Sequence, residues 1–311
     1  MTTTDTSLVV FTRDLRVRDH PALHAGSHAA DRVVTLFVLD DDVLRTWHAN
    51  PNRLGFLLES LDDLRVSVRD LGGELVIRRG DWVQQVAAVA REIDARSVQL
   101  SADVSAFATR RVERLAEALP DDVELHQHPC VTVVPPGSTH PSSGGALKVF
   151  TPYHRRWLDT PWRSVHRAPS SLRPPAATAQ GGIEPGEIPA LSELSDAERS
   201  PDGMPGGETE GLARLKKWAA SSLERYEDQH NALADDDTSR ISPYLHFGCL
   251  SPLEVATRLR SRPGGAAFVR QLAWRDFYHQ ALASQPDAAH ADYRPRGDVW
   301  REDPDDFAAL S

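Results

Sequence analysis

Cysteine is scarce in this sequence, since only Cys130 and Cys249 occur among its 311 residues. The two lie far apart and form no Cys-x-x-Cys pair, so the sequence predicts neither a zinc site nor a disulfide framework. We therefore expect two buried, reduced thiols and no bound metal.

Long apolar runs are also absent. No stretch approaches the roughly 18 consecutive apolar residues that a membrane span requires. The residues before Leu8 include no basic side chain, and the apolar run 8–11 is too short for the hydrophobic region of a signal peptide. We therefore expect a monomeric, cytoplasmic protein without a membrane partner.

Several motifs of catalysis are missing as well. The sequence has no nucleophile elbow, P-loop, zincin helix or paired-carboxylate site, and no Gly-x-Gly-x-x-Gly follows the first predicted strand. Hydrolysis and nucleotide phosphoryl transfer are therefore disfavoured.

Basic residues are fewer than acidic ones, 35 against 45, and the formal net charge is -10 at pH 7. This argues against contact with nucleic acid, since phosphate groups are bound by Lys and Arg. Residues 238–300 differ, because eight arginines against five acidic residues give this window a charge of +3. The distribution indicates a local basic face suited to DNA, with ordinary solvated arginines as the alternative.

The first 130 residues alternate short β-branched runs with longer amphipathic ones. Strands are predicted at 8–11, 33–39, 74–77, 97–100 and 123–126, and helices at 53–71, 82–93 and 106–119. Five strands separated by helices predict an α/β fold with a doubly wound, parallel, Rossmann-like sheet. Ligands of such sheets bind beyond the carboxyl ends of the strands, so the loop 12–20 after the first strand is a candidate site.

A change of composition divides the rest of the chain. Between 134 and 206, Pro, Gly and Ser are frequent, and only 148–157 is aromatic enough to dock on a domain. After Gly206 the pattern becomes helical, and 251–254 (Ser-Pro-Leu-Glu) is typical of a capped helix start. We expect an α/β domain (1–133), an interdomain linker (134–206) and an all-α domain (207–311).

One string in the helical part combines hydroxyl groups with an arginine. It reads Thr238-Ser239-Arg240-Ile241-Ser242 and precedes a helical segment. Hydroxyls and backbone N–H groups at a helix start can hold a diphosphate, to which arginine adds positive charge. An ordinary helix N-cap with a solvated arginine is the alternative.

A second string, residues 268–279, places aromatic residues beside arginines. Trp274, Phe277 and Tyr278 cluster on one side of the predicted helix. Aromatic rings and arginines on a cavity wall would stack an extruded base and hold its backbone. The alternative is ordinary packing, with the rings in the core and the arginines at the surface.

Together these strings resemble motifs of the photolyase/cryptochrome family, in the family's order and at its spacing. Similar motifs occur over nearly the whole chain. They are Phe11-Thr12-Arg13-Asp14-Leu15-Arg16 with Asp19-His20-Pro21-Ala22-Leu23, Lys148 to Tyr153, Gly207 to Leu215, Tyr226, His246 to Pro252, and Trp274-Arg275-Asp276-Phe277-Tyr278. The resemblance implies a DNA photolyase with an antenna domain followed by a flavin-binding domain.

The resemblance implies light-dependent repair of cyclobutane pyrimidine dimers in DNA, with an electron passing from reduced FAD to the dimer and returning after the ring splits. It assigns FAD binding to Tyr226, Thr238, Ser239, Arg240, Ile241, Ser242 and Phe268, and lesion binding to Gln271, Trp274, Arg275 and Tyr278. Trp300 takes the place of a surface tryptophan that transfers electrons, with helix packing as its alternative role. A folate or deazaflavin antenna would bind to the first domain, and the reaction requires no metal, acid or base from the protein.

Two positions depart from the family pattern. Gln271 stands where the family often has Glu, which keeps a hydrogen-bonding group but removes the charge. His230 stands where many members have Arg, so a phosphate contact there is doubtful at neutral pH.

The resemblance also implies a Gly-x-Thr-Gly-Tyr-Pro motif and further helices after Trp300, and these do not occur before Ser311. We therefore expect a truncated photolyase with an incomplete flavin-binding domain that binds FAD poorly. Two other functions stay open. One is a cryptochrome-like blue-light sensor, because these motifs do not separate repair from signalling, and the other is a nucleotide- or pterin-binding α/β module with a vestigial helical tail.

Overall fold

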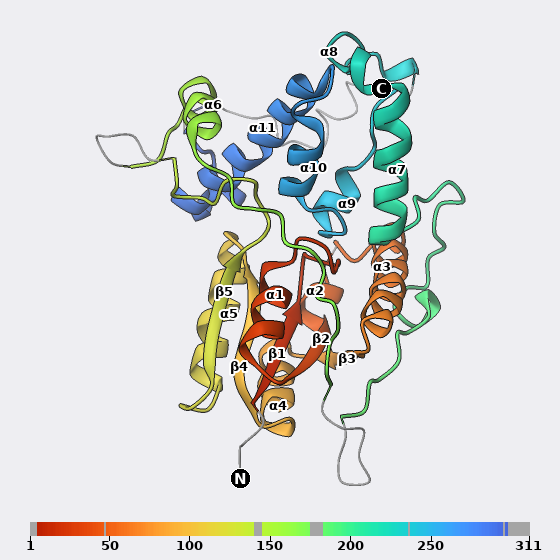
Figure 1. Ribbon diagram of the computed structural model, residues 1–311, viewed down its shortest axis with the longest axis vertical. Helices are drawn as coiled ribbons and strands as arrows, with labels where there is room; N and C mark the ends of the chain where they lie inside the picture. Colours follow the sequence, from red (N-terminus) through yellow and green to blue (C-terminus); the bar gives the residue numbers. More distant parts are fainter. Residues whose placement is uncertain are drawn as a thin grey trace.

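The amino-terminal part of the chain is built on one five-stranded parallel sheet (Figure 1). The computed structural model describes residues 5–46, 48–139, 145–174, 183–235, 237–294 and 296–297. The strands are β1 (Thr6–Phe11), β2 (Arg32–Asp40), β3 (Leu75–Gly80), β4 (Ala95–Ala102) and β5 (Glu124–Pro129). They pair in parallel in the order β3-β2-β1-β4-β5. The predicted α/β fold is confirmed.

The side chains of β1 alternate between two cores, one on each face of the sheet. The helices that cover the sheet are α1 (Pro21–Ala29), α3 (Pro51–Asp70), α4 (Trp82–Glu92) and α5 (Ala106–Ala118). Leu8 and Val10 belong to the core with α4 and α5. Val9 and Phe11 belong to the core with α1 and α3. This period-two alternation in a strand buried on both faces explains why the sequence of β1 is apolar throughout.

Each of the covering helices begins at a side chain that caps its first turn. The capping side chains accept hydrogen bonds from backbone N–H groups at distances between 2.9 and 3.2 Å, and they belong to His20, Asn50, Asp81 and Ser105. Such caps satisfy N–H groups that have no partner within the helix. Helix α1, capped by His20, was not predicted, because its short sequence lacks a clear apolar period. A further short helix, α2 (Asp41–Leu44), follows β2.

The segment between the sheet and the helical part makes backbone hydrogen bonds to the α/β part at several points, while its helix packs against α11 (Gly265–Ser284). It contains α6 (Phe150–Asp159), formed by the aromatic segment that was predicted to dock, and the short 3-10 turn η1 (Leu191–Glu193). The described residues 160–174 run over the α/β part as an extended chain (Figure 1). Val33 N donates to Arg173 O (2.8 Å), and Ile77 N donates to Pro185 O (2.7 Å). Backbone hydrogen bonds therefore fix the path of this segment.

After Gly206 the described chain is helical, as predicted. Its elements are α7 (Glu208–Ser221), η2 (Leu223–Arg225), α8 (Tyr226–Gln229), η3 (Leu233–Asp235), α9 (Ser242–His246), α10 (Pro252–Leu259), α11 (Gly265–Ser284) and η4 (Pro286–Ala289). Ser251 caps α10 by accepting a hydrogen bond from Glu254 N at 3.1 Å. None of the described helices combines the length and apolar character that a membrane crossing needs.

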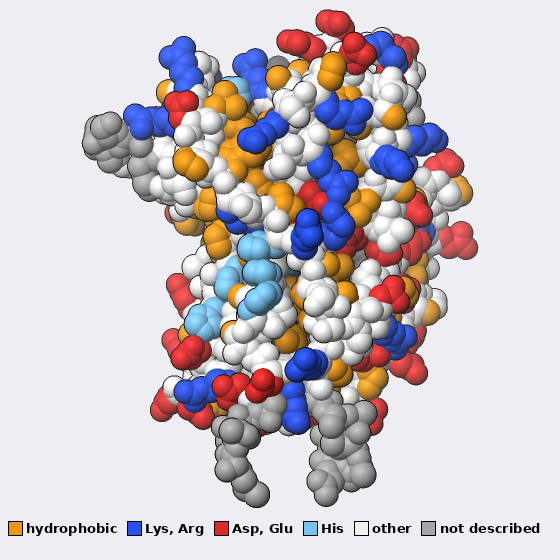
Figure 2. Space-filling view, in the orientation of Figure 1, with side chains coloured by type: hydrophobic (Ala, Val, Ile, Leu, Met, Phe, Trp, Pro, Cys, Tyr) orange, Lys and Arg blue, Asp and Glu red, His pale blue; other side chains and the backbone are white. Residues whose placement is uncertain are grey.

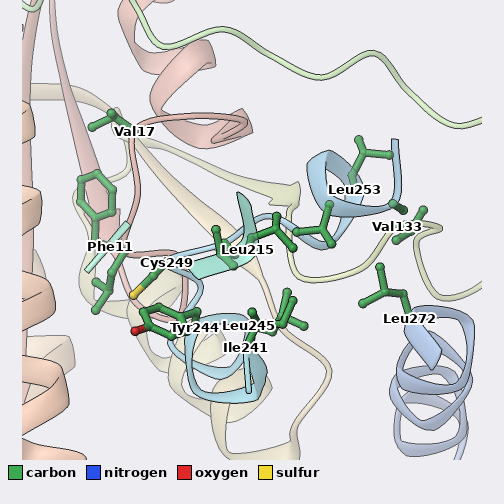
Figure 3. Close-up of a cluster of buried hydrophobic side chains, with 14 of the residues drawn as sticks. Phe11, Val17, Val133, Leu215, Ile241, Tyr244, Leu245, Cys249, Leu253 and Leu272 are labelled. Atoms are coloured by element: carbon green, nitrogen blue, oxygen red, sulfur yellow. The ribbon is translucent and has the colours of Figure 1, made fainter. Parts of the chain in front are cut away.

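One hydrophobic core continues from the sheet into the helical part. Figure 3 shows Phe11 of β1 near Leu215 of α7 and Tyr244 of α9 within this core. The ring centroid of Phe56 in α3 lies 5.1 Å from that of Tyr244 and 5.0 Å from that of Phe247. The α/β part and the helical part therefore bury apolar surface against each other.

Candidate functional site

The loop 12–20 lies at the carboxyl end of β1, where the topology predicts a candidate ligand site. In the structure the helical part of the same chain occupies this place. Leu15 N donates to Phe247 O (3.2 Å), and Arg16 Nη1 donates to Gly248 O (2.8 Å). The loop 12–20, predicted as a candidate ligand site, therefore forms the seam between the two parts.

Arg16 is the central cation of this seam and is 1% exposed. Its Nη2 donates to Asp19 O (2.8 Å) and lies 2.9 Å from the Sγ of Cys130, while its Nε donates to Arg18 O (3.0 Å). A buried guanidinium is tolerated when its N–H groups are all engaged in this way. Both cysteines of the chain are free and buried, as expected.

Asp19 joins the loop to the linker segment and to α10. Its carboxylate accepts hydrogen bonds from Arg163 Nη2 (3.0 Å), from His166 N (3.0 Å) and from Ser251 Oγ. Burial alone would raise the pKa of Asp19, but these donors, above all Arg163, lower it overall. Asp19 is therefore ionised at neutral pH and binds three segments together.

Two of the predicted flavin residues lie in one aromatic cluster. The ring centroids of Tyr226 and Phe268 are 5.2 Å apart. Trp218 of α7 completes the cluster, since its ring centroid lies 5.6 Å from that of Tyr226 and 4.8 Å from that of Phe268. Trp218 Nε1 also donates to Asp237 O (2.8 Å), directly before the predicted hydroxyl-rich turn. The cluster and the turn are therefore linked through Trp218.

The residues of the turn 238–242 differ in burial and in backbone conformation. Ser239 and Ile241 are buried, and Ile241 belongs to the hydrophobic core. Arg240 is exposed and has a positive φ of 50°, which few residues other than glycine adopt. Within the described part of the chain, the hydroxyls of Thr238, Ser239 and Ser242 make no hydrogen bond.

Helix α11 carries the predicted lesion residues. Gln271 and Tyr278 are exposed, and Trp274 is half-buried. The ring of Trp274 stacks on Phe150 of α6, with the centroids 3.6 Å apart and the planes 7° apart, and the ring of Tyr278 lies 5.8 Å away on α11 itself. Phe150 therefore covers one face of the tryptophan that was predicted to stack on the dimer.

Arg275 lies on α11 beside these residues but reaches into the seam. Its Nη1 donates to Val131 O, and its Nη2 donates to Leu245 O (3.4 Å) in α9. Since the hydroxyl-rich turn leads into α9, Arg275 ties α11 to the helix that follows the turn. The roles of these residues toward FAD and DNA stay predictions. Trp300 lies outside the described residues.

Two cavities lie on the α/β part rather than beside α11. The first, of about 230 Å³, lies at the carboxyl ends of β2 and β3 and is lined by Asp40, Asp42, Asp81, Trp82, Val83, Phe107, Arg110, Arg111 and Arg114. Within it the guanidinium carbon of Arg111 sits 4.1 Å from the ring centroid of Trp82. The second, of about 290 Å³, lies between α1 and residues 169–173. Among the described residues, no group of His, Cys, Asp and Glu side chains is arranged to hold a metal ion.

Charged side chains are unevenly distributed over the face in Figure 2. Lys and Arg gather over the helical part, and a group of histidines lies on the α/β part below it. Part of the basic surface is paired, because Glu254 Oε1 accepts hydrogen bonds from Arg18 (2.8 Å) and Arg258 (2.6 Å). On the α/β part and the adjoining linker segment, the ring centroids of His24 and His166 are 4.2 Å apart.

Sequence reasoning missed three residues of the site and the seam. Trp218 was given no role from the sequence, although a tryptophan on the buried face of a helix brings an N–H donor that needs a partner. Phe150 and Glu208 were matched to family motifs without a role. Their contacts join segments more than a hundred residues apart, which no local pattern reveals.

A doubly wound sheet that shares one core with a helical part is the architecture of photolyases and cryptochromes. The family model described as DNA photolyase matches residues 7–175, and the chain belongs to this family. The deoxyribodipyrimidine photo-lyase of Streptomyces griseus is 44% identical over 97% of this chain and 66% of its own length. The protein of that name from Halobacterium salinarum is 32% identical over 94% of this chain and 65% of its own length.

Cryptochromes are among the relatives as well. The cryptochrome DASH of Gloeobacter violaceus is 30% identical over 96% of this chain and 64% of its own length. The chain thus spans about two thirds of the length of the curated relatives it matches.

Solved structures agree on the fold. A Synechocystis cryptochrome superposes with a TM-score of 0.86 at 24% identity, covering 99% of this chain and 68% of that one. A class III photolyase from Agrobacterium tumefaciens superposes with a TM-score of 0.85 at 23% identity, covering 99% of this chain and 66% of that one.

Proposed function

We propose that this chain acts in the light-dependent repair of cyclobutane pyrimidine dimers, as a deoxyribodipyrimidine photolyase, a lyase acting on carbon–carbon bonds. The observation that carries the proposal is the position of the turn 238–242, which directly follows Asp237. The carbonyl oxygen of Asp237 accepts a hydrogen bond from Trp218, whose ring clusters with those of Tyr226 and Phe268. The name of the Streptomyces griseus relative supports the same activity. We further propose a monomer in the cytoplasm, divided into residues 1–133, 134–206 and 207–311.

The residues of the turn fit a dinucleotide. Hydroxyls that have no hydrogen-bond partner among the described residues, together with the backbone N–H groups that begin α9, suit the oxygens of a diphosphate. Thr238, Ser239 and Ser242 would hold the diphosphate, with Arg240 and the backbone of Ile241 beside them. Bound FAD in its reduced form would supply the electron that light drives to the dimer. Tyr226 and Phe268 would shield it from water.

Damaged DNA would bind against α11. Gln271, Trp274 and Tyr278 present an amide and two aromatic rings at or near the surface. Aromatic rings stack on an extruded base, and a dimer is extruded more easily than an intact pair because the damage weakens its stacking. In the family pattern Arg275 belongs to this group too. Trp300 would serve as the surface residue of an electron chain.

An antenna chromophore, a folate or a deazaflavin, would bind at the carboxyl edge of the sheet. The helical part already occupies the place beyond β1. The neighbouring cavity beyond β2 and β3 offers the rings of Trp82 and Phe107 and the charge of Arg110. Its volume of about 230 Å³ suits one planar ring system, with the remainder of the molecule outside.

A blue-light sensor is the second candidate function, and the 30% identity to a cryptochrome DASH favours it. An assay of dimer-containing DNA, with and without illumination, distinguishes the two. Light-dependent loss of dimers supports repair, whereas flavin photochemistry without repair supports sensing.

Cofactor binding has its own test. Titration of the chain with FAD, followed by flavin fluorescence, should give an affinity that falls about tenfold in Ser239→Ala, because a hydrogen bond to a charged group contributes about 1.5–3 kcal/mol. Ser27→Ala, on α1, is the matched control and should bind like the wild-type chain. Equal affinity of all three chains would contradict the proposed diphosphate site.

A further inference from the structure

The loop that follows β5 is held by two adjacent residues of α11. Arg275 Nη1 donates a hydrogen bond to Val131 O. Asp276 Oδ2 accepts hydrogen bonds from Val133 N (2.9 Å) and Val134 N (3.0 Å). Consecutive residues of one helix therefore bind carbonyl and N–H groups of the same short stretch of the α/β part. We call this pair the Arg275–Asp276 clamp.

The same carboxylate oxygen also holds α6. Trp157 Nε1 donates to Asp276 Oδ2 at 2.9 Å, and both side chains are buried. Within the described residues, Asp276 Oδ1 has no hydrogen-bond partner, so all the bonds of this carboxylate converge on one oxygen. Ring packing extends the joint, since the centroids of Tyr153 and Phe277 lie 5.3 Å apart. Asp276 therefore fixes both the loop and α6 relative to α11.

These contacts determine where the proposed lesion residues lie. Gln271, Trp274 and Tyr278 sit within about one turn of the clamp on the same helix. Rotation or sliding of α11 would carry all three side chains with it, because the helix backbone moves as one element. The clamp resists such movement by bonding directly to backbone atoms of the α/β part. A displacement of about 1 Å at a reacting group can lower a rate about 100-fold.

Arg275 is poorly placed to bind a DNA phosphate itself. Both of its terminal nitrogens donate to backbone carbonyls, and its side chain is 19% exposed. Arg270 on the same helix differs. It is exposed, it lies 5.8 Å from the ring centroid of Phe150, and among the described residues no carboxylate pairs with it.

We propose that Arg275 and Asp276 are positioning residues, which hold the lesion-facing side of α11 against the α/β part, and that Arg275 makes no contact with DNA. The inference rests on the proposed repair function. It therefore changes the role of Arg275 from lesion binding, which the family resemblance implies, to positioning of α11.

Arg275→Gln and Arg270→Gln are a matched pair that tests this assignment. The experiment measures the Kd for a dimer-containing duplex and for an undamaged duplex of the same sequence at several salt concentrations. Arg275→Gln should lower the preference for the dimer about tenfold and leave the salt dependence unchanged. Arg270→Gln should weaken both complexes alike and reduce the salt slope by about one. An unchanged preference with a reduced slope in Arg275→Gln would overturn the proposal.

The pH dependence of dimer preference tests the other half of the clamp. Burial raises the pKa of Asp276 to about 6, and the titratable or charged side chains that face it are Arg275 of α11 and Tyr153 of α6. The wild-type preference should fall below about pH 6, as the carboxylate takes up a proton and loses acceptor strength. Asp276→Asn should show a low preference that does not change with pH. A constant wild-type preference between about pH 5 and 8, or a pH-dependent one in Asp276→Asn, would overturn the proposal.

Near-ultraviolet circular dichroism separates failure of the clamp from failure of the repair function. The stacked pair of Phe150 and Trp274 gives a signal without flavin or DNA. If the wild-type chain shows no preference for dimer-containing DNA, the proposed function fails. In that case, Arg275→Gln and Asp276→Asn still test the clamp. A weaker near-ultraviolet signal with an unchanged far-ultraviolet signal in both variants supports it. An unchanged near-ultraviolet signal overturns it.

Discussion

The carboxylate of Glu208 accepts a hydrogen bond from the backbone N–H of Val17 at 2.8 Å, although 191 residues separate them in the sequence. Its second oxygen accepts a hydrogen bond from Arg18 N at 3.3 Å. Glu208 lies at the start of α7 and is buried, so this contact between the helical part and the loop after β1 is shielded from water. The seam therefore contains an acid whose protonation matters for stability.

Ionisation of Glu208 should lower the free energy of unfolding as the pH rises from about 4.5 to 7. Burial raises the pKa of Glu208 to about 7, despite the opposing hydrogen bonds from Val17 and Arg18. Between about pH 4.5 and 7 the unfolded chain loses this proton while the folded chain keeps it, so the free energy of unfolding falls by about 3 kcal/mol over that window. Chemical denaturation of the wild-type chain and of Glu208→Gln measures the effect, because the amide cannot ionise.

The difference in stability between the two chains should therefore shift in favour of Glu208→Gln as the pH rises. Glu210→Gln, two residues further along α7 and exposed, is the control and should follow the wild-type curve. Parallel curves for the wild-type chain and Glu208→Gln would show that the buried carboxyl does not titrate in this range.

Gly248→Ala should destabilise the seam severely. Gly248 has a φ of +71°, and a Cβ added to it would lie 2.0 Å from the carbonyl oxygen of Arg13. Backbone strain and this clash together should cost about 3–5 kcal/mol. Gly145 has a similar φ of +78° with nothing within 4 Å of the added Cβ, so Gly145→Ala should cost only about 1–2 kcal/mol. Equal melting temperatures for the two variants would show that the close approach at Gly248 is not essential.

The sheet and its helices could be predicted from the sequence because their signals are local. The apolar run of β1 and the helical spacing in 53–71 report burial within a few residues, and the structure has β1 at Thr6–Phe11 and α3 at Pro51–Asp70. Helix α1 was not predicted because its sequence carries no such local signal. Its cap, His20, is an unusual capping residue, and its short sequence, Pro-Ala-Leu-His-Ala-Gly-Ser-His-Ala, contains a single large apolar side chain.

The site was harder to predict because its contacts are made between distant segments. A pattern can place Trp274 on a helix, but only packing shows that Phe150 lies against it. The loop after β1 was predicted as a candidate site because the carboxyl end of a parallel sheet suits a ligand. A second part of the same chain fills that place equally well, and its donors and acceptors, such as Gly248 O, satisfy the same groups that a ligand would.

A chain that ends at Gly206 should not behave as a stable module. Removal of the helical part would uncover Phe56 of α3, which is 4% exposed in the whole chain and packs against Tyr244. It would also leave Arg16 without its acceptor at Gly248. We expect residues 1–206 to bind a hydrophobic dye and to aggregate in sedimentation velocity, whereas residues 1–311 do neither. A soluble, monomeric 1–206 that does not bind the dye would instead support an independent nucleotide- or pterin-binding α/β module.

Phe150→Ala should both destabilise the chain and uncover Trp274. Phe150 is buried and its ring stacks on Trp274 at a centroid distance of 3.6 Å, so truncation removes a large buried ring and a stacked pair. The loss should be about 3–4 kcal/mol in chemical denaturation. Leu158→Ala on the same helix is the control, because Leu158 is 57% exposed and its truncation should change stability by less than about 0.5 kcal/mol.

Acrylamide should quench tryptophan emission more strongly in Phe150→Ala than in the wild-type chain, and this difference should vanish when Trp274 is also replaced by Phe. If the difference persists without Trp274, another tryptophan is responsible, and Phe150 does not control access to the face of α11 on which the lesion is proposed to stack.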